Sequence, residues 1–392
     1  MAARNHALDS LRGLAALAVA LGHSNLAVTG LAAWAATWRD LPHLDGTALL
    51  GRLLYLVFPS DAAVTLFFVL SGHVLWRSFD RSLARQRGDA APPALRFTRE
   101  LPDYVAGRLY RLLPTVLVAS IPVALLKGAS VATLVENILL LRTDLLGVTW
   151  TLQVELVCSL ALFVLHRLVR GRPGGALLAL LALGSVAVFF RGWNFALFFP
   201  AFLLGALIDA MPRRLWRPAT LWLGLLLLCC GNLFLGRSGA GRLAEMAGAV
   251  ALLGSAGALN PAVLRRAPLV LLGRISYPFY LLHPLGAAIA GPVVAAAALT
   301  GPAERIALIA VLSISVALPL AWVAHLAVEQ PAMDGRPRLR FGARSRAPAS
   351  PAGEEQAQPA RAETPRPASP RGGARLREAA GLEAASGSVS PT

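Results

Sequence analysis

The sequence has few charged residues. Asp, Glu, Lys and Arg make up only 15% of its 392 residues, whereas 56% are hydrophobic. A typical soluble domain has about 25% charged residues, and the mean hydropathy here is +0.60. Because the shortage of charge extends over most of the length, it excludes an ordinary soluble domain and predicts a protein that crosses a membrane several times.

Lysine and cysteine are also scarce. Lys127 is the only lysine, so the excess of 37 Lys+Arg over 21 Asp+Glu is almost entirely arginine. The arginines gather in short gaps between apolar runs, which favours a role in membrane topology over nucleic-acid binding. The three cysteines, Cys158, Cys229 and Cys230, lie within apolar runs and have neither metal-ligand nor disulfide spacing. We therefore expect no metal site and no disulfide framework.

Ten stretches approach the roughly 20 largely apolar residues that a membrane-spanning helix needs. They predict an all-α polytopic membrane protein with about ten transmembrane helices around a central cavity. A shorter apolar run at 133–141 is expected to lie at the membrane interface. The predicted spans are 8–25, 60–76, 108–127, 147–166, 174–190, 194–211, 218–236, 243–260, 268–290 and 304–328.

The arginines are dense in alternate gaps, at 77–111, 167–172, 213–217 and 265–266. The positive-inside rule then places both termini in the cytoplasm. Composition rich in Ala, Gly and Arg favours a bacterial protein, which we expect in the inner membrane. A signal peptide is the alternative interpretation of the opening stretch, but no clear small-x-small cleavage site follows Gly22-His23.

The last part of the chain has a different composition. Residues 334–392 are rich in Pro, Ala, Arg, Glu, Gly and Ser and have no apolar periodicity. Such a segment cannot bury enough apolar surface to fold. We therefore divide the chain into a transmembrane domain, 1–331, and a disordered cytoplasmic tail, 332–392.

The first predicted helix contains a cation and an imidazole. In LDSLRGLAALAVALGHS (8–24), Arg12 and His23 are eleven residues apart, which is close to three helical turns. They therefore share one face and lie about 16 Å apart along the helix axis. Arg12 is expected near the inner end and His23 near the outer end. Asp9, one turn before Arg12, is a candidate cap or counter-ion.

Two later segments carry further ionisable groups. Glu155 lies about two turns into TWTLQVELV, and Ser276, Tyr280 and His283 form one polar stripe at offsets of four and three. We predict that His23, Glu155 and His283 meet at a similar depth. A carboxylate at helix centre costs about 2.5–3.5 kcal/mol on insertion scales and needs a partner. His283 is equally well explained by a hydrogen bond to a carbonyl of a neighbouring helix.

Two short motifs have a structural and a functional interpretation. Arg108 and Arg111 in GRLYRLLP are one turn apart at the expected inner end of the third span. Their spacing fits membrane-interface anchors, and the alternative is a phosphate clamp. Ser71 and Gly72 in FFVLSGHVLW lie in mid-helix, where small residues indicate close helix packing. The segment offers no histidine at catalytic spacing for a serine nucleophile.

In this order, the motifs resemble the integral-membrane acyltransferase 3 family, which O-acylates bacterial surface glycans and some secondary metabolites. LDSLRGLAALAVALGH (8–23) is similar to the opening helix of the family, in which ten residues separate an arginine from a histidine, here Arg12 and His23. The later matches are FFVLSG (67–72), RLYR (108–111), WTLQVEL (150–156), ISYPFYLLHP (275–284) and VEQP (328–331). The resemblance covers about residues 7–331. His73 and Cys158-Ser159 depart from the usual pattern, and we expect no hydrolase-like domain of the kind that is fused to some members.

The resemblance implies a membrane O-acyltransferase that uses cytoplasmic acyl-CoA, with acetyl-CoA expected, and a carbohydrate or glycosylated acceptor. It implies His23 as general base, with Glu155 orienting the imidazole. His283 or Tyr280 would stabilise the oxyanion. The residues expected to bind the donor are Arg12, Arg108, Arg111, Ser71 and Tyr280. The resemblance implies neither a metal nor a nucleic-acid partner. The protein is expected to lie in a lipid bilayer. Acceptor identity, acyl length and homo-oligomer formation stay open.

Two other functional classes are compatible with a many-span chain. A transporter of an anionic solute or acyl donor would usually have repeated halves, and 1–165 and 166–331 show no self-similarity. A membrane sensor or scaffold could use the arginine-rich tail as its output. That second class leaves Glu155 and the spacing of Arg12 and His23 unexplained.

Overall fold

A computed structural model describes residues 5–85, 92–169 and 194–335, with isolated positions between 172 and 184. The chain divides into one unit of residues 1–342 and a second of residues 343–392. The second unit lies outside the described residues, as does the expected tail from residue 336 onward. Most of the span predicted at 174–190 also lies outside them.

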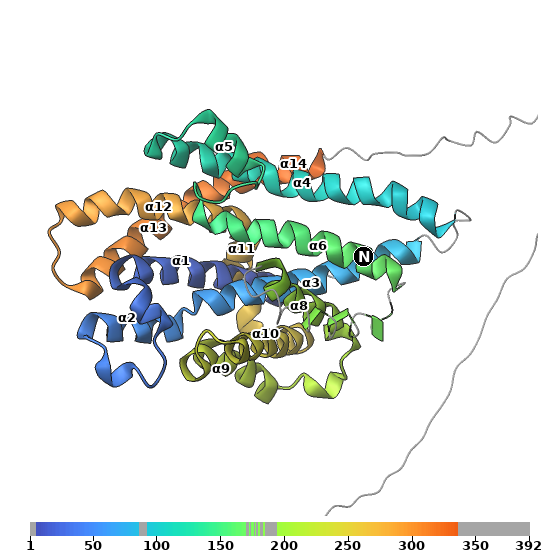
Figure 1. The fold of residues 1–392 in the computed structure, drawn as a ribbon, viewed down its shortest axis with the longest axis horizontal. Helices are drawn as coiled ribbons and strands as arrows, with labels where there is room; N and C mark the ends of the chain where they lie inside the picture. Colours follow the sequence, from blue (N-terminus) through green and yellow to red (C-terminus); the bar gives the residue numbers. More distant parts are fainter. Residues whose placement is uncertain are drawn as a thin grey trace, which may run out of the picture. The chain divides into compact units, whose positions relative to one another are not determined.

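The described residues form helices and connecting loops, without a strand (Figure 1). This confirms the predicted all-α class. The helices are α1 (His6–Ala35), α2 (Gly46–Val57), α3 (Ser60–Arg85), α4 (Pro93–Lys127), α5 (Val131–Ile138), α6 (Trp150–Leu168), α8 (Asn194–Leu207), α9 (Pro218–Leu235), α10 (Gly239–Leu259), α11 (Ala267–Arg274), α12 (Ser276–Ala296), α13 (Pro302–Ala324) and α14 (Gln330–Asp334).

Within the described residues, eight helical stretches are long and apolar enough to cross a membrane. They correspond to eight of the ten predicted spans, so the chain is a multi-pass membrane protein. The span predicted at 194–211 is α8, a shorter apolar helix of 14 residues. The stretches are His6–Ala35, Gly46–Arg85, Leu95–Lys127, Gly147–Leu168, Pro218–Leu235, Gly239–Leu259, Ser276–Ala296 and Pro302–Asp334.

One predicted span is divided into two helices in the structure. The stretch at 268–290 contains two helices, because α11 ends at Arg274 and α12 begins at Ser276. Between them Ile275 has φ −90° and ψ 4°, outside regular helix geometry. Hydropathy does not detect this break, since both helices are apolar. The break leaves the carbonyl of Gly273 available to a side chain of α1.

Helix α1 lies at the centre of the part that carries the site. It contacts α3, α10, α12 and α13, and Figure 1 shows α1 and α3 side by side. Asn5 begins the helix, since its side chain accepts a hydrogen bond from the N–H of Ala7. Gly13 permits close packing on α11, because a Cβ there would lie 2.6 Å from the nitrogen of Gly273. This contact brings the first turns of α1 against the α11–α12 break.

Helices α3 and α8 cross at two glycines. A Cβ on Gly72 would overlap the carbonyl of Phe202, and a Cβ on Gly205 would overlap the carbonyl of Val69. Both clashes involve backbone, which cannot swing away as a flexible side chain would. The packing interpretation of Gly72 is therefore confirmed.

We expect Gly72→Ala to lower the free energy of unfolding by about 1–3 kcal/mol or more, as overpacked helix interfaces do. Thermal unfolding of the purified protein in detergent measures this. Gly46→Ala is the matched control, because no atom lies within 4 Å of a Cβ at that position. Equal unfolding temperatures for the two variants would contradict the expected clash.

Candidate active site

Two cavities lie between the helices that carry the predicted site residues. The Arg12 cavity, of about 140 Å³, is lined by α1, α3, α4, α6 and α12. The His23 cavity, of about 620 Å³, is nearer the C-terminal part of α1. Val64 and Tyr280 line both cavities. The sequence predicted a central cavity, and the structure has two cavities that share these two lining residues.

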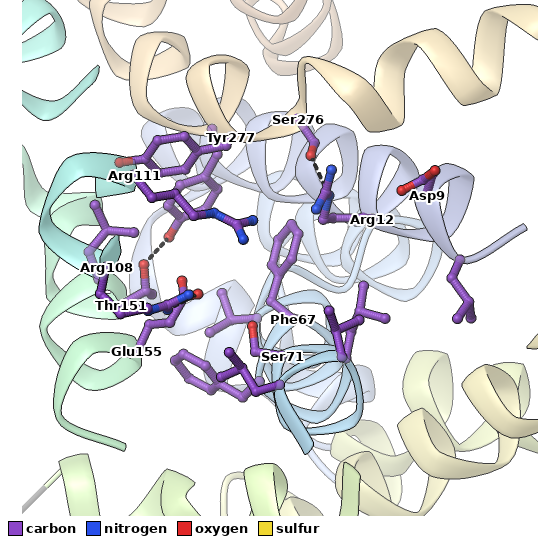
Figure 2. Close-up of a pocket in the computed structure, with 18 residues that line it drawn as sticks. Asp9, Arg12, Phe67, Ser71, Arg108, Arg111, Thr151, Glu155, Ser276 and Tyr277 are labelled. Atoms are coloured by element: carbon purple, nitrogen blue, oxygen red, sulfur yellow. Dashed lines mark hydrogen bonds and ion pairs between the residues drawn. The ribbon is translucent and has the colours of Figure 1, made fainter. Parts of the chain in front are cut away.

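Arg12 is held at the α11–α12 break (Figure 2). Its Nε donates to Oγ of Ser276 at 2.9 Å, and its Nη2 donates to the carbonyl oxygen of Gly273 at 2.8 Å. A cation at the C-terminal end of α11 also interacts favourably with the helix dipole. Arg12 thus lines its cavity from a fixed position, with Asp9 on the same wall.

Glu155 forms an ion pair with Arg108. The Nη2 of Arg108 donates to Oε1 of Glu155 at 2.6 Å, and the two side chains are 7% and 21% exposed. The pair joins α4 to α6 on the wall of the Arg12 cavity. In Figure 2, Phe67 lies between this pair and Arg12.

The predicted role of Glu155 in orienting His23 is therefore wrong for this arrangement. The carboxylate lines the Arg12 cavity, whereas His23 lines the other chamber. The physical reason is the partner on α4. A guanidinium offers a full opposite charge and a charge-assisted hydrogen bond, which stabilise a buried carboxylate more than a neutral imidazole does.

The remaining residues predicted to bind the donor also line the Arg12 cavity. Arg111 extends into it from α4, and Ser71 lies on the α3 wall (Figure 2). Tyr280 is at the boundary with the other chamber. Its hydroxyl lies 3.0 Å from Oγ1 of Thr151 and donates to the carbonyl oxygen of Val148 at 3.3 Å.

His23 and His283 contact each other directly. Nδ1 of His23 lies 2.9 Å from Nε2 of His283, and Nδ1 of His283 lies 2.7 Å from the carbonyl oxygen of Tyr280. His283 is buried, and its own carbonyl accepts a hydrogen bond from Ser313. The predicted meeting of three ionisable groups thus holds for the two histidines and fails for Glu155.

This chain of hydrogen bonds fixes both tautomers when the rings are neutral. A carbonyl can only accept, so Nδ1 of His283 carries the proton and its Nε2 is an acceptor. Nδ1 of His23 must then donate to that acceptor, which leaves Nε2 of His23 without a proton. Among the residues that the structure describes, this nitrogen has no hydrogen-bond partner. An imidazole in this state can accept a proton.

The same geometry removes the predicted oxyanion role of His283. One of its nitrogens donates to Tyr280 and the other accepts from His23, so no N–H is left for a ligand. His283 is instead a positioning residue for His23. The oxyanion role of Tyr280 stays a prediction, and it would require the hydroxyl to leave the carbonyl oxygen of Val148, to which it donates.

The sequence analysis missed a charged cluster in the His23 cavity. Oδ2 of Asp61 lies 3.3 Å from Arg237 and 3.7 Å from Arg242. Arg242 also pairs with Glu245 at 2.8 Å, and the guanidinium of Arg237 lies 3.4 Å from the ring centre of Trp34. Glu245 was a detectable signal, because it is an acidic residue inside the apolar span predicted at 243–260.

No group of three or more His, Cys, Asp or Glu side chains in the described ranges could hold a metal ion. Among the described residues, the Arg12 cavity is thus rich in arginine, and the His23 cavity contains an imidazole with an unprotonated nitrogen. A ligand with anionic groups suits the first chamber. A polar group that gives up a proton suits the second.

Comparison with known proteins identifies the domain but no individual relative. No curated protein and no solved structure matches the chain significantly. The acyltransferase domain that defines the acyltransferase 3 family matches residues 5–324, which include both chambers and their lining helices. The chain therefore belongs to the membrane-embedded acyltransferase 3 family.

Proposed function

We propose that the protein transfers an acyl group, in the first instance acetyl, from acyl-CoA to a hydroxyl of a glycan or glycosylated acceptor. His23 is the general base. The observation that carries the proposal is the hydrogen-bond chain from the carbonyl of Tyr280 through His283 to His23. This chain leaves Nε2 of His23, in the His23 cavity, able to accept a proton from a hydroxyl group.

The reaction needs only one proton carrier. The acceptor oxygen attacks the thioester carbon, while its proton moves to Nε2 of His23. A C–O bond forms and the C–S bond breaks. The imidazolium then returns the proton to the departing sulfur, which gives an ester and the thiol of CoA. Asp61 lines the same cavity, where it is paired with Arg237 and Arg242.

The donor is proposed to enter through the Arg12 cavity. Arg12, Arg108 and Arg111 line it together with apolar side chains of α3, including Phe67 and Leu75. Arginines match phosphate groups, and an apolar wall suits a thin acyl-pantetheine arm. Tyr280 and Val64 line both cavities, so the thioester carbon would lie beside them, where the arm meets the acceptor.

The proposed orientation follows from the donor and from the arginine-rich gaps. The Arg12 cavity faces the cytoplasm, where acyl-CoA is supplied, and the His23 cavity faces the outside of the inner membrane. Both termini of the chain then lie in the cytoplasm. The acceptor binds from the outer side, beside the charged cluster of Asp61, Arg237 and Arg242.

The test uses purified protein in liposomes with acetyl-CoA labelled in the acetyl group. The acceptor probe is an envelope-glycan extract from the host after deletion of the gene. We expect CoA release and labelled glycan only when both probe and protein are present. Mass spectrometry of the glycan should show an added acetyl group.

The alternative function, a transporter for an anionic solute or acyl donor, predicts a different outcome. Labelled acetyl-CoA would then accumulate inside the liposomes, with no CoA release and no labelled glycan. That result would overturn the proposed transfer reaction.

A further inference from the structure

A third cavity lies at the same end of the bundle as the Arg12 cavity. We call it the Trp216 cavity, and its volume is about 430 Å³. It is formed by the first turn of α1, the second half of α3, the loop after α8 and the last turns of α10. Leu8 lines both this cavity and the Arg12 cavity. The two cavities are therefore neighbours at the junction of α1 and α3.

The Trp216 cavity combines basic groups with an aromatic ring. Arg77 and Arg213 line it, and Arg77 pairs with Asp209 at 3.3 Å. A guanidinium has five N–H donors, so one carboxylate contact leaves others for a ligand. His73 also lines the cavity, with a side chain that is 7% exposed and a nitrogen 3.9 Å from Asp209. The transfer reaction uses none of these residues.

Trp216 is held in place by a glycine. A Cβ on Gly254 would lie 2.4–2.7 Å from three carbons of the indole ring, so the ring rests directly on the backbone of α10. A larger residue at position 254 would push the ring away. The contact thus fixes an aromatic surface at the edge of a basic cavity. Such a surface can stack with a planar base.

The Arg12 cavity alone does not accommodate a complete CoA molecule. Its volume of about 140 Å³ is below the roughly 300–1,000 Å³ of pockets that enclose drug-sized ligands. Two of its three arginines are already engaged, Arg12 by Ser276 and Gly273, and Arg108 by Glu155. The narrow, largely apolar cavity suits part of the thin acyl-pantetheine arm, so the nucleotide must lie elsewhere.

We infer that the Trp216 cavity binds the nucleotide end of the acyl donor, an adenosine with its phosphate groups, while the pantetheine arm extends past Leu8 into the Arg12 cavity. The adenine stacks on Trp216, and Arg77 and Arg213 bind phosphate. This rests on the proposed use of acyl-CoA. It adds a second binding site, on α3, α10 and the loop after α8, that contributes affinity without touching the reacting atoms.

The test measures binding to the full-length protein in detergent by calorimetry. The probes are CoA, 3′-dephospho-CoA, adenosine 3′,5′-bisphosphate and 4′-phosphopantetheine, which lacks the nucleotide. We expect Trp216→Ala and Arg213→Ala each to weaken CoA binding roughly tenfold, the loss typical of one stacked base or one charged hydrogen bond. Binding of 4′-phosphopantetheine should not change. Adenosine 3′,5′-bisphosphate should compete with CoA.

Arg214→Ala is the matched control for Arg213→Ala, because Arg214 is in the same loop but does not line the cavity. It should bind CoA nearly as the unaltered chain does. Gly254→Val, which displaces the ring of Trp216, should reproduce the effect of Trp216→Ala. Correct folding is shown by unchanged binding of 4′-phosphopantetheine.

Two results would overturn the inference, and they differ in what else they affect. Equal CoA affinity in all variants, or equal losses for CoA and 4′-phosphopantetheine, would exclude the Trp216 cavity but leave the acyltransferase proposal intact. If the unaltered protein binds none of the four probes, the choice of acyl-CoA as donor fails as well.

Discussion

Replacing His23 with alanine is expected to lower the rate of acyl transfer by about 10²–10⁴-fold, the contribution typical of a general base. The variant loses the imidazole that lines the His23 cavity and whose Nε2 has no hydrogen-bond partner among the described residues. It should still insert and fold, because His23 packs at the edge of a cavity rather than in the apolar core. Steady-state release of CoA from acetyl-CoA, in the presence of the glycan probe, measures the loss.

His43→Ala is the control, because His43 is an exposed histidine in a loop outside the three cavities. It should transfer at the rate of the unaltered chain. His283→Ala should slow transfer less than His23→Ala, because it removes the hydrogen bond that fixes the tautomer and leaves the base. His283→Gln should recover part of that loss, since its amide oxygen can still accept from His23. Full transfer by His23→Ala would remove this residue from the mechanism.

Breaking the Arg108–Glu155 pair is expected to have the largest effect on stability. Removing one partner of a buried, hydrogen-bonded ion pair leaves the other charge uncompensated, which costs about 3–5 kcal/mol. We expect Arg108→Ala and Glu155→Ala each to lower the free energy of unfolding by about this amount. The double variant should lose less than the sum of the two, because it leaves no unpaired charge.

Thermal unfolding of the four proteins in detergent supplies the double-mutant cycle. The Arg142–Asp144 pair is the control, with the same chemistry and a contact of the same length, 2.6 Å, but with half-exposed side chains. Removal of Arg142 should not change the unfolding temperature measurably, because solvent screens exposed pairs. Additive losses at Arg108 and Glu155 would show that the two side chains do not interact.

The ion pair also bears on the proposed donor site. Because Arg108 is neutralised by Glu155, the positive field of the Arg12 cavity depends mainly on Arg12 and Arg111. Of these, Arg12 is already bonded to Ser276 and Gly273. The arginine motif at 108–111 thus combines Arg108, which is paired with Glu155, and Arg111, which lines the cavity and has no ion pair among the described residues. The interpretation of this motif as a phosphate clamp stays a prediction.

The helices followed from the sequence because membrane crossing constrains composition directly. A span must be long and apolar, so hydropathy alone located the eight described helical stretches. The resemblance of the motifs in 8–23, 67–72, 108–111 and 150–156 likewise predicted the family that the domain match shows. The short α8 and the break between α11 and α12 were not predicted, because the mean hydropathy of both segments stays high even though Arg274 ends α11.

The sequence by itself determined the helical class, the multi-pass character and the set of polar residues that must lie among apolar helices. Only the tertiary structure decided which of those residues meet. Glu155 pairs with Arg108 and not with His23, and His23 contacts His283. These contacts depend on the rotation and depth of helices that are far apart in the chain. Periodicity gives the face of one helix, but the neighbour that it meets is set by packing between helices.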